Sequence, residues 1–118
     1  MMETTFKFAD DLEHEALNKV AASLSAIWET EKVIVFGSRV RGDFSGFSDW
    51  DVLVVINDIA KRHTVIYELH EIELEYDIPL SPVLMTTKEY EMNRKLKSSF
   101  IENIEKEGIV IYDAHRWR

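Results

Sequence analysis

Two aspartates, Asp49 and Asp51, stand one residue apart at the start of an apolar run, Val52–Ile56. Short β-branched runs bounded by polar residues are typical of buried strands. Because side chains alternate between the faces of a strand, both carboxylates would point the same way, with Cα atoms roughly 6–7 Å apart. Mg²⁺ commonly binds through one or two carboxylates plus phosphate oxygens of a substrate. The pair therefore indicates a site for one Mg²⁺ or two adjacent ions, although each aspartate alone also fits a solvated strand end.

A Gly-Ser dipeptide, Gly37-Ser38, follows the preceding apolar run, Val33–Phe36. Glycine lets the backbone come close to a ligand. Ser38 supplies a hydroxyl and an N–H group where the chain is expected to enter a short helix, and a helix N-terminus with free N–H groups is an anion site. The order of strand, polar loop and strand predicts that a phosphate-binding turn and metal-binding carboxylates converge on one edge of a sheet.

The loop from Arg39 to Ser48 carries the only cluster of positive charge near these carboxylates. A guanidinium matches phosphate oxygens, so Arg39 and Arg41 are candidates for contact with a triphosphate. The alternative, a pair of solvated loop arginines, stays equally open. Phe44 and Phe47 are expected to fold the loop back onto the domain.

The spacing of these residues resembles the signature of a known superfamily. Gly37-Ser38, ten residues and then Asp49-x-Asp51 is similar to the nucleotidyltransferases that include DNA polymerase beta. Residues 37–43 and 48–54 more closely resemble the minimal nucleotidyltransferases (the MNT group), small prokaryotic proteins often paired with HEPN-domain partners. The element order and the tail, residues 103–112, also resemble that group. The resemblance implies an α/β (α+β) fold with a small mixed β-sheet of about four strands flanked by helices.

The resemblance also implies an activity. A metal-dependent nucleotidyltransferase would move a nucleoside monophosphate from a Mg-NTP to a hydroxyl acceptor and release pyrophosphate. The acceptor would lie on a partner protein, a HEPN-type toxin, and a homo-oligomer stays open. In this interpretation the catalytic and metal-binding residues are Asp49 and Asp51, with two Mg²⁺ ions between them and the triphosphate. The nucleotide-binding residues are Gly37, Ser38, Arg39, Arg41 and Ser48.

One expected group is missing. Active members of the family usually carry a third carboxylate on the strand that we predict over Leu80–Thr86, where our register places Ser81. Asp77 has the same parity as Ser81 but lies roughly 13 Å away along a strand, so either a changed register or a partner would have to replace the carboxylate. Activation of the attacking hydroxyl is then in doubt. The alternative function is a catalytically weak or inactive, antitoxin-like module that neutralises a HEPN-type partner by binding.

The remaining pattern predicts the elements that position the site. Apolar residues at three- and four-residue steps predict a helix from about Ala9 to Thr30, with Trp28 as a core or hinge anchor. A second helix is expected from about Ile59 to Glu75. Further predictions are helices capped by Thr87 and by Ser98 or Ser99, a C-terminal cap at Gly108, a strand over Ile109–Tyr112 and a polar tail to Arg118.

Length and composition narrow the classes of function. The 118 residues predict a single domain over 1–118, and cysteine is absent, which excludes a thiolate metal site. The net charge of −8 disfavours wrapping of a nucleic acid backbone but allows nucleotides, because a bound cation inverts the local charge. No run resembles a signal peptide or a membrane span, so a cytoplasmic location is expected. A partner is expected to dock near Ser81 or near Trp117.

Overall fold

The computed structural model describes residues 6–43 and 48–117, with only the backbone described for Trp117. The elements follow the predicted order. They are α1 (Asp11–Ser25), β1 (Thr30–Phe36), α2 (Ser38–Arg41), β2 (Trp50–Ile56), the 3-10 turn η1 (Ile59–Lys61), α3 (Arg62–Tyr76), β3 (Leu80–Thr86), α4 (Thr87–Lys95), α5 (Ser99–Glu107), β4 (Ile109–Asp113) and α6 (Ala114–Trp117). The predicted α/β class with a small mixed sheet is confirmed.

The described strands form one four-stranded sheet in the order β3-β2-β1-β4. Strand β1 is antiparallel to β2 and β4, whereas β2 and β3 are parallel. The two apolar runs of the central stretch are thus neighbours in one sheet, and Phe36 at the end of β1 pairs with Asp51. The Gly-Ser turn and the two aspartates therefore lie at the same end of the sheet, as the sequence predicted.

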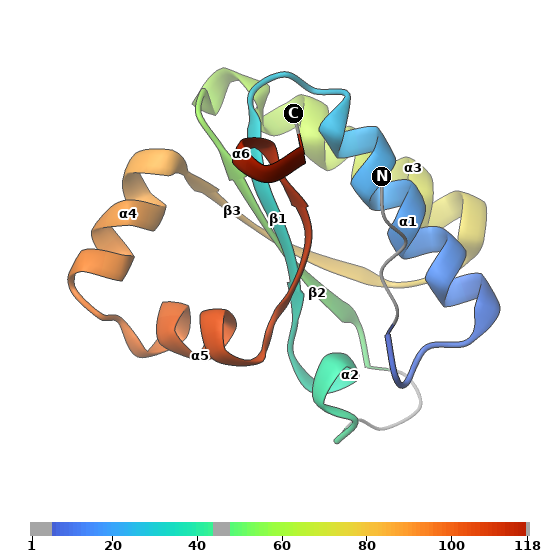
Figure 1. Cartoon of the computed structure of the whole chain (residues 1–118). Helices are drawn as coiled ribbons and strands as arrows, with labels where there is room; N and C mark the ends of the chain where they lie inside the picture. The colour runs from blue at the N-terminus through green and yellow to red at the C-terminus, as the bar shows by residue number, and fades with distance from the viewer. Residues whose placement is uncertain (1–5, 44–47, 118) are drawn as a thin grey trace.

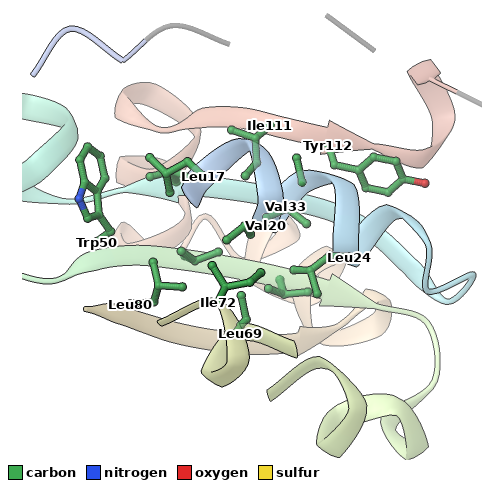
Figure 2. Close-up of a cluster of buried hydrophobic side chains, with 14 of the residues drawn as sticks. Leu17, Val20, Leu24, Val33, Trp50, Leu69, Ile72, Leu80, Ile111 and Tyr112 are labelled. Atoms are coloured by element: carbon green, nitrogen blue, oxygen red, sulfur yellow. The ribbon is translucent and has the colours of Figure 1, made fainter. Parts of the chain in front are cut away.

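Helices cover both faces of the sheet, with α1 and α3 on one side and α4 and α5 on the other (Figure 1). The larger core cluster lies under α1 and α3, with Trp50 at one end of the labelled residues (Figure 2). The smaller cluster joins Ile34, Leu53 and Val55 to Ile101 and Ile104 of α5. Along β2 the side chains alternate between these clusters, so Trp50 faces α1 and α3 while Asp51 lies on the face of α4 and α5.

The first helix is shorter than predicted. It ends at Ser25, and Thr30 already belongs to β1, where it is buried and pairs with Ile56. Pairing with a central strand thus outweighs the helical periodicity at this end. Trp28 lies in the connecting turns and is 73% exposed, so its prediction as a core anchor was wrong.

Helix termini later in the chain follow their capping residues. Thr86 rather than Thr87 caps α4, because its hydroxyl accepts from the N–H of Glu89 and the Glu89 carboxylate accepts from the N–H of Thr86. Ser98 caps α5, whose last N–H bond runs from Gly108 to the carbonyl of Ile104 at 2.7 Å.

The C-terminal tail, predicted only as polar, forms α6. The expectations for the side chains of Phe44, Phe47 and Trp117 fall outside the described residues. Over the described part of the chain, no helix is both long and apolar enough to cross a membrane.

Candidate active site

The carboxylate of Asp51 lies directly against the backbone of the Gly-Ser turn. Gly37 has φ 89°, a left-handed conformation that favours glycine, and a Cβ atom added there would lie 2.1 Å from Oδ2 of Asp51. A side chain at position 37 would therefore displace the carboxylate. The glycine brings the predicted phosphate-binding turn and a predicted metal ligand into contact.

The electrostatics of the aspartate pair favour a bound cation. Burial raises the pKa of Asp51 above its ordinary value, the charge of Asp49 raises it further, and the charge of Arg41 opposes both. Asp49 is exposed, whereas Asp51 is half-buried. Two close carboxylates with one opposing arginine are hard oxygen donors in a field of excess negative charge, so they suit Mg²⁺.

Helix α2 is a single turn that holds Ser38 at the end of β1. The N–H groups of Val40 and Arg41 both donate to the carbonyl of Gly37 at 3.1 Å, and the N–H of Gly42 donates to that of Ser38 at 2.7 Å. Gly42, with φ 91°, ends the turn in the left-handed region. The polar loop therefore begins tightly wound against the sheet edge.

Arg41 projects on the side of the carboxylates. Its Nη1 donates to Oε2 of Glu107 at 3.0 Å, and its Nε lies 3.2 Å from each carboxylate oxygen of Asp43. These two partners, Asp43 first, raise the pKa of the guanidinium, which stays charged. Beside it lies a cleft of about 190 Å³ lined by Gly37, Arg41, Phe100, Glu107 and their neighbours. Arg41 is thus placed where a phosphate group bound at the Gly-Ser turn would need a cation.

Arg39 turns to the opposite face of the sheet. Its guanidinium pairs with Oε2 of Glu13 on α1 and lies 5.1 Å from the ring centre of Trp50. The Arg39 and Glu13 side chains are only 11% and 12% exposed. The structure therefore places Arg39 neither in a solvated loop nor beside Asp49 and Asp51. Ser48, the other predicted nucleotide-binding residue, is half-buried and immediately precedes Asp49.

The register of β3 bears on the missing third carboxylate. Strands β2 and β3 pair without a shift from Trp50–Leu80 to Ile56–Thr86, which sets Ser81 opposite Asp51 as predicted. Asp77 is exposed in the turn before β3, where its φ of 54° ends α3. Within residues 6–43 and 48–117, no group of three or more His, Cys, Asp or Glu side chains is placed to hold a metal.

Sequence reasoning missed Glu13 and Glu107, which hold the two arginines. A signal for Glu13 is present, because it stands three residues after the helix cap Asp10 and falls on the apolar stripe with Ala16, Leu17 and Val20. A carboxylate on a buried helix face requires a donor or a cation. Nothing comparable marks Glu107, which lies 66 residues from Arg41.

Comparison with known proteins identifies the family. The profile of the family described as "Nucleotidyltransferase domain" matches residues 17–111, which include β1 to β3 and most of β4. The chain belongs to this nucleotidyltransferase family. Two relatives from Methanocaldococcus jannaschii are named "Putative protein adenylyltransferase MJ0141" and "Putative protein adenylyltransferase MJ0604". The first is 31% identical over 69% of this chain and 78% of its own, and the second is 33% identical over 70% and 78%.

A solved structure supports the fold independently of close sequence similarity. A chain from Sulfolobus solfataricus, titled "Crystal structure of a putative nucleotidyltransferase", superposes with a TM-score of 0.51 at 18% identity. The match covers 86% of this chain and 81% of that one. The family match over residues 17–111 includes Gly37, Asp49 and Asp51, and membership of a nucleotidyltransferase family implies a nucleotide substrate.

Proposed function

We propose that this protein transfers a nucleoside monophosphate, with adenylate from ATP as the first candidate, to a hydroxyl group on a partner protein. Family membership supports nucleotidyl transfer, and the names of the two relatives favour an adenylyl donor and a protein acceptor. The observation that carries the proposal is the contact between Asp51 and the Gly37 backbone, with Asp49 and Arg41 beside it.

Each residue has a role in this reaction. Asp49 and Asp51 would hold Mg²⁺, which when bound offsets charge on the triphosphate and on the leaving pyrophosphate. The Gly37-Ser38 turn and Arg41 would hold the β and γ phosphates and so orient the α-phosphorus for in-line attack. The acceptor oxygen forms a bond to the α-phosphorus while the bond from that phosphorus to the bridging oxygen of the β-phosphate breaks. The hydroxyl proton passes to water or to a base of the partner, because Ser81 offers no carboxylate.

The open shape of the site is the reason for assigning the acceptor to a second protein. The cleft beside Gly37 holds about 190 Å³, less than the roughly 300–1,000 Å³ of typical ligand sites. Strand β3 is an edge strand, and Pro82 next to Ser81 is exposed there. A partner docking along this edge would supply the missing wall and the hydroxyl. A HEPN-domain protein is the candidate that the sequence resemblance implies.

Labelling with α-³²P nucleotides tests the proposal. The parent protein is incubated with each labelled NTP and Mg²⁺, with and without the product of the adjacent gene. We expect label on the partner only when both proteins are present, and none with the Asp49→Asn, Asp51→Asn double variant. A matched control removes two exposed carboxylates elsewhere, by Asp11→Asn and Glu75→Gln, and should label normally. Rapid labelling of a free small molecule by the chain alone would contradict a protein acceptor.

One observation favours a second function, neutralisation of the partner by binding. Ser81 stands opposite Asp51 where the resemblance implies a carboxylate, and this weakens the case for activation of the hydroxyl. One experiment with the double aspartate variant distinguishes the two functions. If the double aspartate variant still neutralises the partner in the absence of any NTP, binding suffices and transfer is dispensable.

A further inference from the structure

Glu13 is a buried carboxylate on α1. From the face of the sheet opposite Asp51, it contacts the chain segments that carry the Gly37-Ser38 turn and the aspartate pair. Its Oε2 accepts from Nε1 of Trp50 at 2.8 Å and from Nη2 of Arg39, and its Oε1 accepts from the N–H of Asp10 at 3.0 Å. Trp50 is fully buried and stacks near the Arg39 guanidinium. We refer to Glu13, Arg39 and Trp50 as the Glu13 cluster.

The two side-chain partners of Glu13 are sequence neighbours of the proposed substrate-binding residues. Arg39 directly follows Ser38 of the phosphate-binding turn, and Trp50 stands between Asp49 and Asp51. Because neighbouring strand residues face opposite ways, a Trp50 side chain held on the α1 face directs Asp51 to the other face. One carboxylate therefore ties the turn and the aspartate pair to the same helix.

The cluster is closed to a nucleotide. The ring of Phe6 lies edge-on to Trp50, with centroids 5.8 Å apart, and the N–H of Phe6 donates to Nε2 of His14 on α1 at 2.9 Å. The segment before α1 thus covers the indole on the side away from Asp51. A group buried here acts on the substrate only through the residues that it holds.

We propose that Glu13 is a positioning residue, which sets the distance between the Gly37-Ser38 turn and the aspartate pair by holding Arg39 and Trp50. This inference rests on the proposed function for its nucleotide readouts. Replacing a buried ion pair by apolar groups is often neutral for stability, so stability alone does not account for this pair. Fixing two chain segments relative to each other is a role that apolar side chains of similar volume would perform less well, because they lack directed hydrogen bonds.

The variant Glu13→Gln tests the inference through the sign of the change in affinity. Glutamine keeps the size of the side chain but loses the charge opposite Arg39 and one acceptor oxygen. We expect the Kd for Mg-ATP and the KM to rise about 10-fold, with kcat within about 2-fold, because the phosphates are held equally in the ground and transition states. If Arg39 were instead a phosphate ligand that Glu13 sequesters, the variant would release it and binding would tighten, which overturns the proposal. Glu15→Gln, an exposed change of the same kind two residues away, is the control.

Two further variants separate positioning from stability. Trp50→Phe keeps an aromatic ring and removes the N–H donor, and should raise the Kd in the same direction by about 3-fold. Glu13→Met with Arg39→Met removes both charges, and we expect a melting temperature near that of the parent with affinity still weakened about 10-fold. If the double methionine variant had both the melting temperature and the Mg-ATP affinity of the parent, the role of Glu13 would be purely structural and the proposal would be overturned.

Hydrogen exchange without nucleotide keeps this test distinct from the test of function. We expect faster amide exchange in a peptide covering residues 37–43 of Glu13→Gln than in the parent or Glu15→Gln, because the turn loses its attachment. Unchanged exchange there would overturn the inference even if the parent binds Mg-ATP. Absence of Mg-ATP binding by the parent would instead overturn the proposed function, and the exchange result would still decide whether Glu13 holds the turn.

Discussion

The segment from Asp49 to Asp51 presents two contrasting environments on the two faces of one strand. On the α1 face, Trp50 is fully buried and its N–H meets a carboxylate that also pairs with Arg39. On the α4 and α5 face, Asp51 is half-buried beside another carboxylate, and its pKa is raised. The three residues from Asp49 to Asp51 thus adjoin a buried, hydrogen-bonded ion-pair cluster on one face and a pair of like charges on the other.

In the proposed function, the first environment stabilises the fold and the second binds the metal ion. A buried polar cluster whose members are joined by directed hydrogen bonds favours one geometry. A pair of like charges gains free energy only when a cation arrives, so its geometry is used in binding rather than in folding. Alternation along a strand lets three residues serve both purposes, since the residue between two candidate metal ligands faces the opposite side.

The face of the sheet that carries α4, α5 and Asp51 is called the open face below. Removing the charges of the aspartate pair there should have the largest effect on activity. In Asp49→Asn, Asp51→Asn we expect transfer to fall on the order of 10³-fold, because binding of Mg²⁺ contributes several kcal/mol to charge stabilisation. The free energy of unfolding should stay the same or rise, since a repulsion is removed. Calorimetry with Mg-ATP and urea unfolding measure the two quantities. A variant that binds Mg-ATP as well as the parent would show that the open face is not the site.

Adding a charge on the open face should produce the next largest effect. Ser81→Asp places a third carboxylate opposite Asp51, where it can accept the proton of the attacking hydroxyl. General base catalysis typically contributes 10²–10⁴-fold, so we expect labelling of the partner to accelerate by about 10²-fold. The variant should be less stable than the parent without metal and recover with Mg²⁺. Ser81→Asn introduces a side chain of the same size as aspartate without the charge, so it should neither accelerate labelling nor make stability depend on Mg²⁺. Equal labelling rates for Ser81→Asp and Ser81→Asn would argue against a missing base.

Gly37 and Gly42, which have positive φ angles at the two ends of α2, offer a sharper comparison. An added Cβ at Gly37 meets Oδ2 of Asp51, whereas one at Gly42 meets Cε2 of Phe8 at 2.5 Å, and Phe8 is 41% exposed and free to turn away. Both Gly→Ala variants carry the backbone strain of positive φ, on the order of 1–2 kcal/mol of stability. Only Gly37→Ala should also weaken Mg-ATP binding, by about 10-fold. Equal losses of affinity in both variants would mean that strain alone is responsible.

Much of the fold was predictable because its signals are local. The strand predicted over Leu80–Thr86 has the bounds of β3, and the β-branched runs before Gly37 and after Asp51 form the two central strands. Trp50 and Asp51 lie on opposite faces of β2, and such alternation can be read from sequence because it follows from backbone geometry and does not depend on the partner strand.

The parts that escaped prediction depend on contacts between distant residues. Arg39 and Glu13 are 26 residues apart, and a loop arginine carries no local sign of the face to which it turns. The end of α1 was misplaced for a related reason, because pairing of Thr30 with Ile56 overrides a helical pattern that continues past Ser25. The local sequence pattern therefore placed the aspartates at the start of a strand. Packing of α1 determines that Arg39 turns away from them while Arg41 stays near them.

The raised pKa of Asp51 predicts a pH dependence confined to the open face. The folded state holds the proton more tightly than the unfolded chain, so the free energy of unfolding falls as the pH rises from the ordinary value of 3.8 through the raised value. Urea unfolding of the parent and Asp51→Asn across this window should show the decline only in the parent, and Mg²⁺ at neutral pH should offset it. Metal binding should weaken as the pH falls through the same window. A parallel pH profile for the two proteins would contradict the prediction.

The smallest expected effect concerns the ion pair that holds Arg41 at the rim of the open face. Nη1 of Arg41 contacts Oε2 of Glu107 at 3.0 Å, and both side chains are more than a third exposed, at 43% and 35%. Exposed pairs contribute roughly 0–1 kcal/mol, so releasing Arg41 can improve phosphate contact by no more than about 5-fold. We expect Glu107→Gln to tighten Mg-ATP binding by about 2-fold, with a stronger salt dependence than the parent. Glu102→Gln, an exposed change on the same helix, should leave the Kd unchanged. This change in Kd is opposite in sign to the one expected for Glu13→Gln. Glu107 on the open face competes with the substrate for an arginine, whereas Glu13 on the α1 face positions the turn and the aspartate pair.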